Sequence, residues 1–412
     1  MKVLVIGGGG REHAIIDKLS ESKLVTKIYA APGNKLIKEC ESVNISATDI
    51  DSLLQFAKEN KIDLTVVGPE AALEKGIVDV FKENNLLIFG PTKAAARIET
   101  SKEFAKNLMV KYNIPTAKFA SFSDFELAKR YLDIHKAPIV VKYDGLAQGK
   151  GVVVAKTYEE ALDAITMMLK DSKFGHDKVI LEDYLEGPEF SFMCFVDGAN
   201  VYPLELSQDH KRAFDNDEGL NTGGMGAYSP LPIISEEDKE YALNNIMIPC
   251  AKALVSENSS FTGVLYGGLM KTKDGIKVIE FNARFGDPET EVILPRLESD
   301  LCQAFMDVIN HKKPILTWSN KFTLGVVMAS VGYPESYVAG YPILDLDKVN
   351  QKVYYMGVSK NGCEVVTHGG RVLIVVADGD TLIEARDKAL ANCKKIKCQN
   401  LFYRTDIGHW SM

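Results

Sequence analysis

The sequence is poor in the features that mark secreted, zinc-stabilised or membrane-embedded proteins. Its seven cysteines are scattered and odd in number, and no two form a C-x-x-C pair, so neither a disulfide scaffold nor a zinc ribbon is indicated. No apolar run approaches the roughly 18 residues of a membrane-spanning helix. The apolar run at 3–6 is too short for the core of a signal peptide. We therefore expect a cytoplasmic protein with reduced thiols.

An excess of positive charge is also lacking. The chain has 48 Lys and Arg against 56 Asp and Glu, which gives a net charge of −8. A mildly acidic chain is a poor candidate for a general nucleic-acid or membrane-surface binder. Local basic groups can still hold an anion, because an Arg about 4 Å from a phosphate gains about 4 kcal/mol at an effective dielectric near 20. The expected partners are small-molecule substrates, and the expected state is a monomer or a weak homo-oligomer.

The first hundred residues alternate between strand and helix patterns. Apolar runs that end in Gly or Pro predict buried strands, and the segments between them have helical spacing. This alternation predicts a Rossmann-like, doubly wound parallel sheet, in which ligands bind at the carboxyl ends of the strands. The expected strands are 3–6, 27–31, 62–67 and 86–89, and the expected helices are 12–20, 49–60 and 77–83.

The pattern changes after residue 100, as expected for a chain of 412 residues that should contain two to four domains of roughly 100 to 200 residues each. Thr100-x-x-Glu103 and Thr157-x-x-Glu160 each predict the start of a helix. From 324 onward, short strands with Gly and Pro turns dominate, and a helix follows Thr381. The expected strands of this half include 138–142, 152–155, a hairpin of 261–270 with 275–282, 325–329 and 371–377.

A glycine cluster, Gly7 to Gly10, follows the first strand and opens a helix. Backbone N–H groups in that position can hold a phosphate. A dinucleotide fingerprint would need G-x-G-x-x-G, but its third position falls on Glu12 or His13, so nicotinamide binding is disfavoured. A tight turn without a ligand is the alternative. The phosphate of a small substrate is the favoured interpretation, because Arg11 lies beside the loop.

A second glycine cluster spans 142–151 between two expected strands. Its glycine spacing is one residue shorter than in a Walker A loop, and Gly151 stands where that motif has Ser or Thr. We therefore interpret it as a hairpin flap whose Lys150 could close over nucleotide phosphates. The alternative is a mobile hairpin with solvated lysines.

A third stretch combines oxygen ligands with a cation near the end of a strand. Residues i and i+2 of a strand share a face, so Glu280 and Asn282 point the same way. A carboxylate and an amide oxygen on one face suit a hard cation such as Mg²⁺. Arg284 lies just beyond and could brace a transferring phosphoryl group. An exposed polar strand face is the alternative.

A fourth pair of stretches, 207–212 and 221–226, is polar and rich in glycine. Neither has helix or strand periodicity, so both are expected to be loops, which in compact domains are often functional. Plain surface loops are the alternative. His210 alone is a weak catalytic candidate, because no partner for it is evident.

Together these stretches resemble the glycinamide ribonucleotide synthetase (phosphoribosylamine–glycine ligase) family of the ATP-grasp superfamily. The combination of DHKR, NTGGMGAY and RFGDPE is far more specific than any single glycine motif. The matches span most of the chain in the order of the family. They are GGGGREHA (7–14), APGN (31–34), VVGPE (66–70), IFGPT (88–92), SKEFAK (101–106), KYDGLAQGKGV (142–152), QDHKR (208–212), NTGGMGAYSP (221–230) and EFNARFGDPET (280–290).

The resemblance implies a reaction and a domain plan. The reaction joins glycine to 5-phosphoribosylamine at the expense of ATP, through a glycyl phosphate, in purine synthesis, with Mg²⁺ or Mn²⁺ as the metal. The plan is an N-terminal α/β domain, a two-lobed α+β ATP-grasp core and a small β-rich C-terminal domain. The expected boundaries are 1–100, 101–190 with the glycine flap, 191–323 with the metal strand, and 324–412.

The resemblance also implies roles for individual residues. The implied metal ligands are Glu280 and Asn282, and the implied catalytic residues are Arg284, Lys142 and Asp209. The implied ATP-binding residues are Lys102, Lys142, Gly145, Gly149, Lys150, Gly151, Glu182, Asp183, Tyr184, Leu185 and Glu189. The implied substrate-binding residues are Gly9, Gly10, Arg11, Glu12, Asn34, Asp209, Lys211 and Arg212.

Three alternatives remain open at this point. One is another ATP-grasp carboxylate ligase that acts on a different amine or amino acid. Another is a nucleotide-binding regulator without turnover, which the presence of Lys142, Glu280, Asn282 and Arg284 disfavours. An NAD-dependent oxidoreductase is the least favoured, because the dinucleotide fingerprint is missing.

Overall fold

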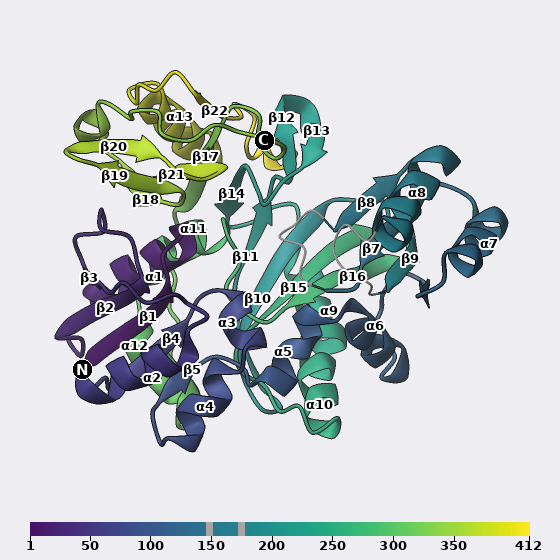
Figure 1. The fold of residues 1–412 in the computed structure, drawn as a ribbon, viewed down its shortest axis with the longest axis horizontal. Coiled ribbons are helices and arrows are strands. Elements are labelled where there is room, and N and C mark those ends of the chain that lie inside the picture. The colour runs from purple at the N-terminus through teal and green to yellow at the C-terminus, as the bar shows by residue number, and fades with distance from the viewer. Residues whose placement is uncertain (146–150, 172–177) are drawn as a thin grey trace.

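The computed structural model describes residues 1–145, 151–171 and 178–412 (Figure 1). Its N-terminal region is a five-stranded sheet in the order β3-β2-β1-β4-β5, with every adjacent pair parallel. This confirms the predicted doubly wound sheet. The strands are β1 (Lys2–Gly7), β2 (Lys27–Pro32), β3 (Glu41–Ser42), β4 (Leu64–Val67) and β5 (Ile88–Phe89), and the helices are α1 (Gly10–Ser20), α2 (Ile50–Glu59), α3 (Glu70–Glu74) and α4 (Ile77–Glu83).

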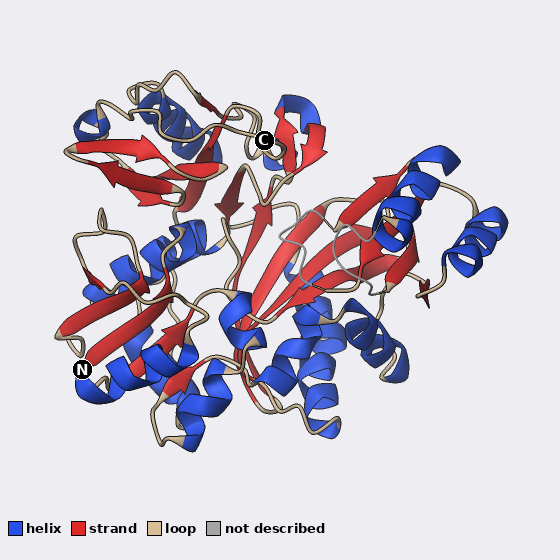
Figure 2. Ribbon diagram, viewed as in Figure 1, coloured by secondary structure: helices blue, strands red, loops and turns tan. Residues whose placement is uncertain are grey.

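Helices cover both faces of this sheet (Figure 2). Successive side chains of a strand point to opposite faces, so Leu4 of β1 joins the core that contains Leu53 of α2. Val5 of β1 joins the opposite core, with Ile15 of α1. A strand buried on both faces needs a continuous apolar run, which is why residues 3–6 could be identified from the sequence.

A second, four-stranded antiparallel sheet has the order β6-β9-β7-β8 and projects away from both ends of the chain with α7 and α8 (Figure 1). Helices α5 and α6 precede it. The strands are β6 (Phe119–Phe122), β7 (Ile139–Tyr143), β8 (Val152–Ala155) and β9 (Val179–Asp183). The helices are α5 (Lys93–Thr100), α6 (Lys102–Lys111), α7 (Phe125–His135) and α8 (Tyr158–Ile165), which continues as a π-helical turn at Thr166–Lys170.

One of the two predicted helix starts was wrong by one residue. Thr100 is the last residue of α5, so it cannot cap the next helix, and Ser101 caps α6 by accepting the N–H of Phe104 at 3.1 Å. The threonine at 157 caps α8 as predicted, accepting the N–H of Glu160 at 3.2 Å.

The largest sheet runs from the β15–β16 hairpin to the C-terminal region in the order β16-β15-β10-β11-β14-β17-β21-β18, with β22 paired to β17. It therefore crosses the expected boundary at residue 324, because β14 pairs with β17. Its strands are β10 (Glu189–Asp197), β11 (Asn200–Asp209), β14 (Gly226–Ser229), β15 (Thr262–Thr272), β16 (Gly275–Asn282), β17 (Phe322–Ser330), β18 (Lys352–Tyr355), β21 (Arg371–Gly379) and β22 (Leu401–Phe402).

Shorter elements complete the fold. The predicted loops at 207–212 and 221–226 were wrong in part, because Asp209 ends β11 and the segment after it forms a two-stranded hairpin. Polar residues in such short strands leave no apolar alternation for the sequence to reveal. The remaining described strands and α-helices are β12 (Arg212–Phe214), β13 (Glu218–Asn221), β19 (Val358–Asn361), β20 (Glu364–Thr367), α9 (Glu236–Ala242), α10 (Ile248–Ser256), α11 (Thr290–Ile293), α12 (Leu301–Ile309) and α13 (Leu382–Cys393). Within the described residues, no helix combines the length and apolar character that crossing a membrane requires.

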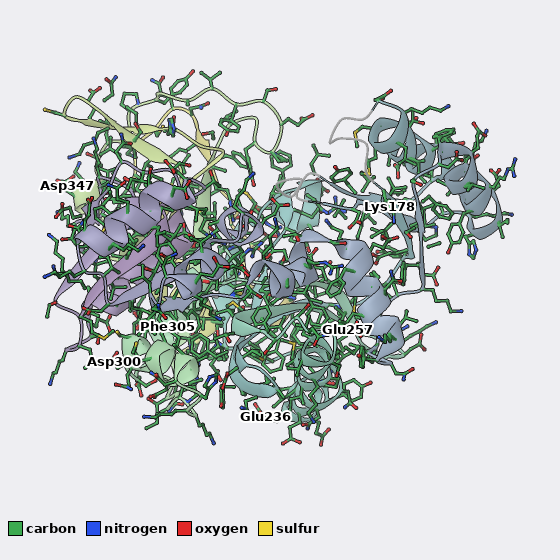
Figure 3. The ribbon with its side chains drawn as sticks, turned by 60° about the horizontal axis from the view of Figure 1, so that its bottom comes forward. Lys178, Glu236, Glu257, Asp300, Phe305 and Asp347 are labelled. Atoms are coloured by element: carbon green, nitrogen blue, oxygen red, sulfur yellow. The ribbon has the colours of Figure 1, made fainter. Side chains whose placement is uncertain are left out.

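An aromatic cluster joins the N-terminal sheet to the large sheet. Phe89 of β5 stacks on Phe305 of α12 with ring centroids 4.2 Å apart, and Phe195 of β10 meets both rings edge-on. All three side chains are buried. Figure 3, in which Phe305 is labelled, shows the dense side-chain packing of this region. This contact fixes the carboxyl edge of the parallel sheet against the rest of the molecule.

Replacing Phe305 with alanine should therefore weaken the whole fold. We expect Phe305→Ala to lower the free energy of unfolding by about 3–5 kcal/mol, through lost burial and the cavity that remains. Urea unfolding of the purified protein measures this loss. Val110→Ala, at a position 62% exposed, is the control and should have little effect. An unchanged midpoint for the Phe305 variant would contradict the assigned packing.

Candidate functional site

A cavity of about 160 Å³ lies between α6 and β7 on one side and β16 on the other. Lys142 of β7 reaches across it, and its Nζ donates to the backbone carbonyl of Ile279 at 3.0 Å. The lining includes Lys102, Lys142, Gly145, Gly151, Glu182, Glu280, Asn282 and Arg284, all of them predicted site residues, together with Glu70, Glu99 and Lys106. The structure thus brings the predicted phosphate-binding strand and the predicted metal strand to one cavity.

Three lysines form the basic side of the cavity. Lys102 donates at 3.1 Å to the carbonyl of Gly145, the last described residue on this side of the predicted flap. Lys142 and Lys106 both approach the buried carboxylate of Glu182, at 3.0 and 2.8 Å. Burial lowers the pKa of Lys102 and lowers that of Lys106 to about 8. Lys106 was missed from the sequence, although its position four residues after Lys102 places both on one helix face.

Glu280 and Asn282 supply oxygen atoms opposite these lysines. Among the described residues, no hydrogen bond is made by either side chain, so both remain available to a ligand. Burial favours a raised pKa for Glu280, but the positive charges of Lys211 and Lys142 outweigh it and lower the pKa. An ionised carboxylate beside an amide oxygen fits a hard divalent cation. The described residues contain no group of three or more His, Cys, Asp or Glu arranged for a metal, so a cation held by this pair would need further oxygen ligands, such as water or phosphate.

Arg284 sits between two carboxylates that the sequence did not mark as partners. Its Nη2 lies 3.0 Å from Glu99 Oε1, and its Nε lies 3.5 Å from Glu70 Oε2. Burial would lower the pKa of Arg284, but Glu99 and Glu70 raise it above its ordinary value. Glu70 stands within the VVGPE stretch, whereas nothing in the sequence singled out Glu99.

The predicted substrate loop near the N-terminus packs directly against the segment that follows the metal strand. Arg11 donates to Glu12 Oε1 at 2.6 Å and to the carbonyl of Phe285 at 3.2 Å. The other oxygen of Glu12 accepts the N–H of Gly9 at 2.7 Å, directly before Gly10 begins α1. Asn34 donates to Val358 at 3.2 Å, in the C-terminal region.

Asp209 and Lys211 line a smaller cavity of about 10 Å³ on the large sheet, together with Glu189. Lys211 pairs with Glu189 at 3.0 Å. Burial, and then the charge of Glu289, raise the pKa of Asp209 well above its ordinary value. One Asp209 oxygen is buried without a hydrogen-bond partner among the described residues. Burial without a hydrogen-bond partner therefore favours the protonated form of this carboxyl.

Comparison with known families decides the classification. Models of the phosphoribosylglycinamide synthetase family match the N domain at 1–99, the ATP-grasp (A) domain at 100–290 and the C domain at 323–410. The chain belongs to the phosphoribosylglycinamide synthetase family. ATP-grasp enzymes in general use ATP and divalent metal ions.

Curated relatives agree along the whole chain. The phosphoribosylamine–glycine ligase of Halalkalibacterium halodurans is 52% identical over 99% of this chain and 96% of its own length. The ligase of Streptococcus pneumoniae is 49% identical over 99% of both chains.

Solved structures agree with the fold. The crystal structure of the Thermotoga maritima phosphoribosylamine–glycine ligase is 31% identical, with a TM-score of 0.87 over 99% of this chain and all of that one. A biotin carboxylase from Campylobacter jejuni, at 15% identity, has a TM-score of 0.74 over 98% of this chain and 92% of its own, which is a likeness of fold alone.

Several other predicted site residues do not line the large cavity. Asp183 ends β9, Tyr184 is 42% exposed and Leu185 follows it outside the strand. Arg212 donates to Gly219 at 2.9 Å within the β12–β13 hairpin. The predicted flap residues Gly149 and Lys150 lie outside the described residues.

The surroundings of His210 fit a structural role and not proton transfer. Burial lowers its pKa to about 3, and Arg404 adds to this effect. Its Nε2 accepts the backbone N–H of Gly408 at 3.1 Å, which requires a neutral ring. The histidine therefore ties the segment after β11 to the C-terminal end of the chain.

Glu291 is a buried carboxyl whose oxygens have no hydrogen-bond partner among the described residues. Burial, and then Asp287, raise its pKa well above the ordinary 4.5. The native protein therefore binds a proton that the unfolded chain releases above pH 4.5, and stability falls as pH rises from there toward the native pKa.

Glu291→Gln keeps the shape of this side chain and removes its titration. We expect the variant to be more stable than the parent at pH 8, and the difference to shrink at pH 5. Urea unfolding at both pH values measures the difference, with the exposed Glu298→Gln as the matched control. A difference that does not change with pH would contradict the buried, protonated state.

Proposed function

We propose that this chain catalyses the ATP-dependent ligation of glycine to 5-phosphoribosylamine, giving glycinamide ribonucleotide, ADP and phosphate in de novo purine (IMP) biosynthesis. The cavity carries this proposal, because three lysines and Arg284 there face Glu280 and Asn282. That arrangement lies in a chain that matches phosphoribosylamine–glycine ligases along almost its whole length.

The chemistry requires an activated carboxylate. The carboxylate of glycine is a poor acyl donor, and transfer of the terminal phosphoryl group of ATP turns one of its oxygens into part of a leaving group. The amine of phosphoribosylamine then attacks the carbonyl carbon, the bond to the phosphate oxygen breaks, and the amine loses a proton. No enzyme nucleophile is needed, so catalysis rests on positioning and electrostatic stabilisation.

We assign the nucleotide to the large cavity. Lys102 and Lys142 contact its phosphates, beneath the flap from Gly145 to Gly151. The segment from Glu182 to Leu185 holds the base, and Glu189 holds the ribose. Glu280 and Asn282 hold Mg²⁺ or Mn²⁺, which when bound offsets the negative charge of the phosphates.

We assign the reacting groups to the neighbouring segments. Arg284 stabilises the transferring phosphoryl group, since its partners Glu99 and Glu70 keep it charged and oriented. Asp209 takes the proton that the amine loses, because its buried Oδ1 has no hydrogen-bond partner among the described residues and so has an acceptor position to offer. The phosphoribosyl group lies between the segments 9–12 and 209–212 and Asn34.

Substrate dependence tests the proposal. We expect ADP release by the purified protein to require glycine, phosphoribosylamine and a divalent metal together. Release that continues without glycine would refute the proposed reaction. A panel of other amines and amino acids identifies a different carboxylate ligase, and ATP binding without any turnover identifies a regulator.

The metal strand has its own test. We expect Glu280→Ala to lower kcat by about 100-fold or more, because the metal ion that would offset the charge of the phosphates loses a protein ligand. Asp274→Ala, an exposed carboxylate in the turn of the same β15–β16 hairpin, is the matched control and should retain activity. Near-normal turnover of the Glu280 variant would overturn the metal assignment.

A further inference from the structure

One buried carboxylate in the nucleotide cavity is shared by two buried lysines. Glu182 Oε2 lies 2.8 Å from Lys106 Nζ, and Glu182 Oε1 lies 3.0 Å from Lys142 Nζ. The residues are 3%, 2% and 3% exposed, respectively. The ammonium groups of Lys106 and Lys142 thus share the carboxylate of Glu182 at a buried position, where water screens their electrostatic interaction only weakly.

The two lysines are held in different ways. Lys106 also donates to Thr116 Oγ1 at 2.8 Å, and that hydroxyl donates to the carbonyl of Val278 at 2.8 Å. This chain of contacts fixes Lys106 of α6 to the floor of the cavity, between β9 and β16. Its ammonium is therefore held by both Glu182 and Thr116.

Lys142 is bound less directionally to the same carboxylate. Glu182 Oε1 accepts no well-aligned hydrogen bond among the described residues, although Lys142 Nζ is 3.0 Å away. The directed hydrogen bond of Lys142 goes instead to the carbonyl of Ile279. Lys142 can therefore move from Glu182 to a phosphate oxygen. This exchange requires that another positive charge still neutralises Glu182 after Lys142 has left.

We propose that Lys106 is a positioning residue that neutralises Glu182 and so frees Lys142 to bind the phosphates of the nucleotide. This role rests on the ATP-dependent function proposed above. Without Lys106, Glu182 would keep Lys142 as its sole counter-ion, because an isolated carboxylate is costly to leave buried. The nucleotide would then have to compete with Glu182 for Lys142.

A double-mutant cycle tests this dependence. The variants are Lys106→Met, Glu182→Gln and the two combined, and the readouts are calorimetric binding of ATP with Mg²⁺ and the KM for ATP. We expect Lys106→Met to weaken ATP binding at least 10-fold and to raise the KM for ATP more than it lowers kcat. In the Glu182→Gln background the same change should have less than a 3-fold effect, because no carboxylate remains to capture Lys142.

A direct phosphate contact by Lys106 predicts the opposite pattern. Lys106→Met would then weaken ATP binding by the same factor in both backgrounds, and that result would overturn the proposal. The comparison within the Glu182→Gln background remains decisive even if Lys106→Met alone fails to fold. Lys106→Arg should restore ATP binding at least in part, since the positive charge is retained.

A lysine on the same helix provides the matched control. The Lys111 side chain is 63% exposed and pairs with Glu257 at the surface, so Lys111→Met should leave ATP binding unchanged. Calorimetry reads ATP binding without turnover. If the parent protein binds ATP but shows no turnover with glycine and phosphoribosylamine, the proposed reaction is wrong. The role of Lys106 in ATP binding can still be tested by the same calorimetry.

Discussion

The structure depends on the pairing of buried charges across one cavity. Removing a charged group from water costs several kcal/mol even after relaxation, so each ion here needs a partner of opposite sign. The partners come from both sheets and from the helices between them, and losing one member would leave an uncompensated charge. The cations are Lys102, Lys106, Lys142 and Arg284, and the anions are Glu70, Glu99, Glu182 and Glu280.

This pairing also explains how the site can be stable before a nucleotide arrives. Arg284 is shared between Glu70 and Glu99, and Glu182 is shared between two lysines. Shared partners can be exchanged for phosphate oxygens without leaving a charge isolated. Glu280, with Asn282 beside it, faces the cavity without an ion pair or a side-chain hydrogen bond among the described residues, which is the arrangement expected of ligands kept for a metal ion.

Much of the fold could be predicted from the sequence, because local patterns encode it. The apolar run at 3–6 predicted a strand buried on both faces. The two-residue period of side chains in the strand at 275–282 predicted that Glu280 and Asn282 share a face. The resemblance then located the family motifs. The helix start at Ser101 and the short strands after Asp209 were missed, because a one-residue shift of a cap and a polar two-stranded hairpin leave weak local signals.

The electrostatic part of the site could not be predicted in the same way. Glu99 meets Arg284, and Lys106 meets Glu182, only because distant elements pack together. No spacing within either segment encodes those contacts. The burial of Glu291 and the neutral state of His210 likewise depend on surrounding elements, so no local pattern could reveal the protonation of either residue.

The most direct test of this account is the position of a metal ion in crystals grown with Mn²⁺ and a non-hydrolysable ATP analogue. Anomalous scattering locates Mn²⁺ without reference to any assumed ligand. The account predicts a peak bound by Glu280 and Asn282, with the analogue's phosphates between that peak and Lys142. A peak elsewhere, with the analogue outside this cavity, would contradict it.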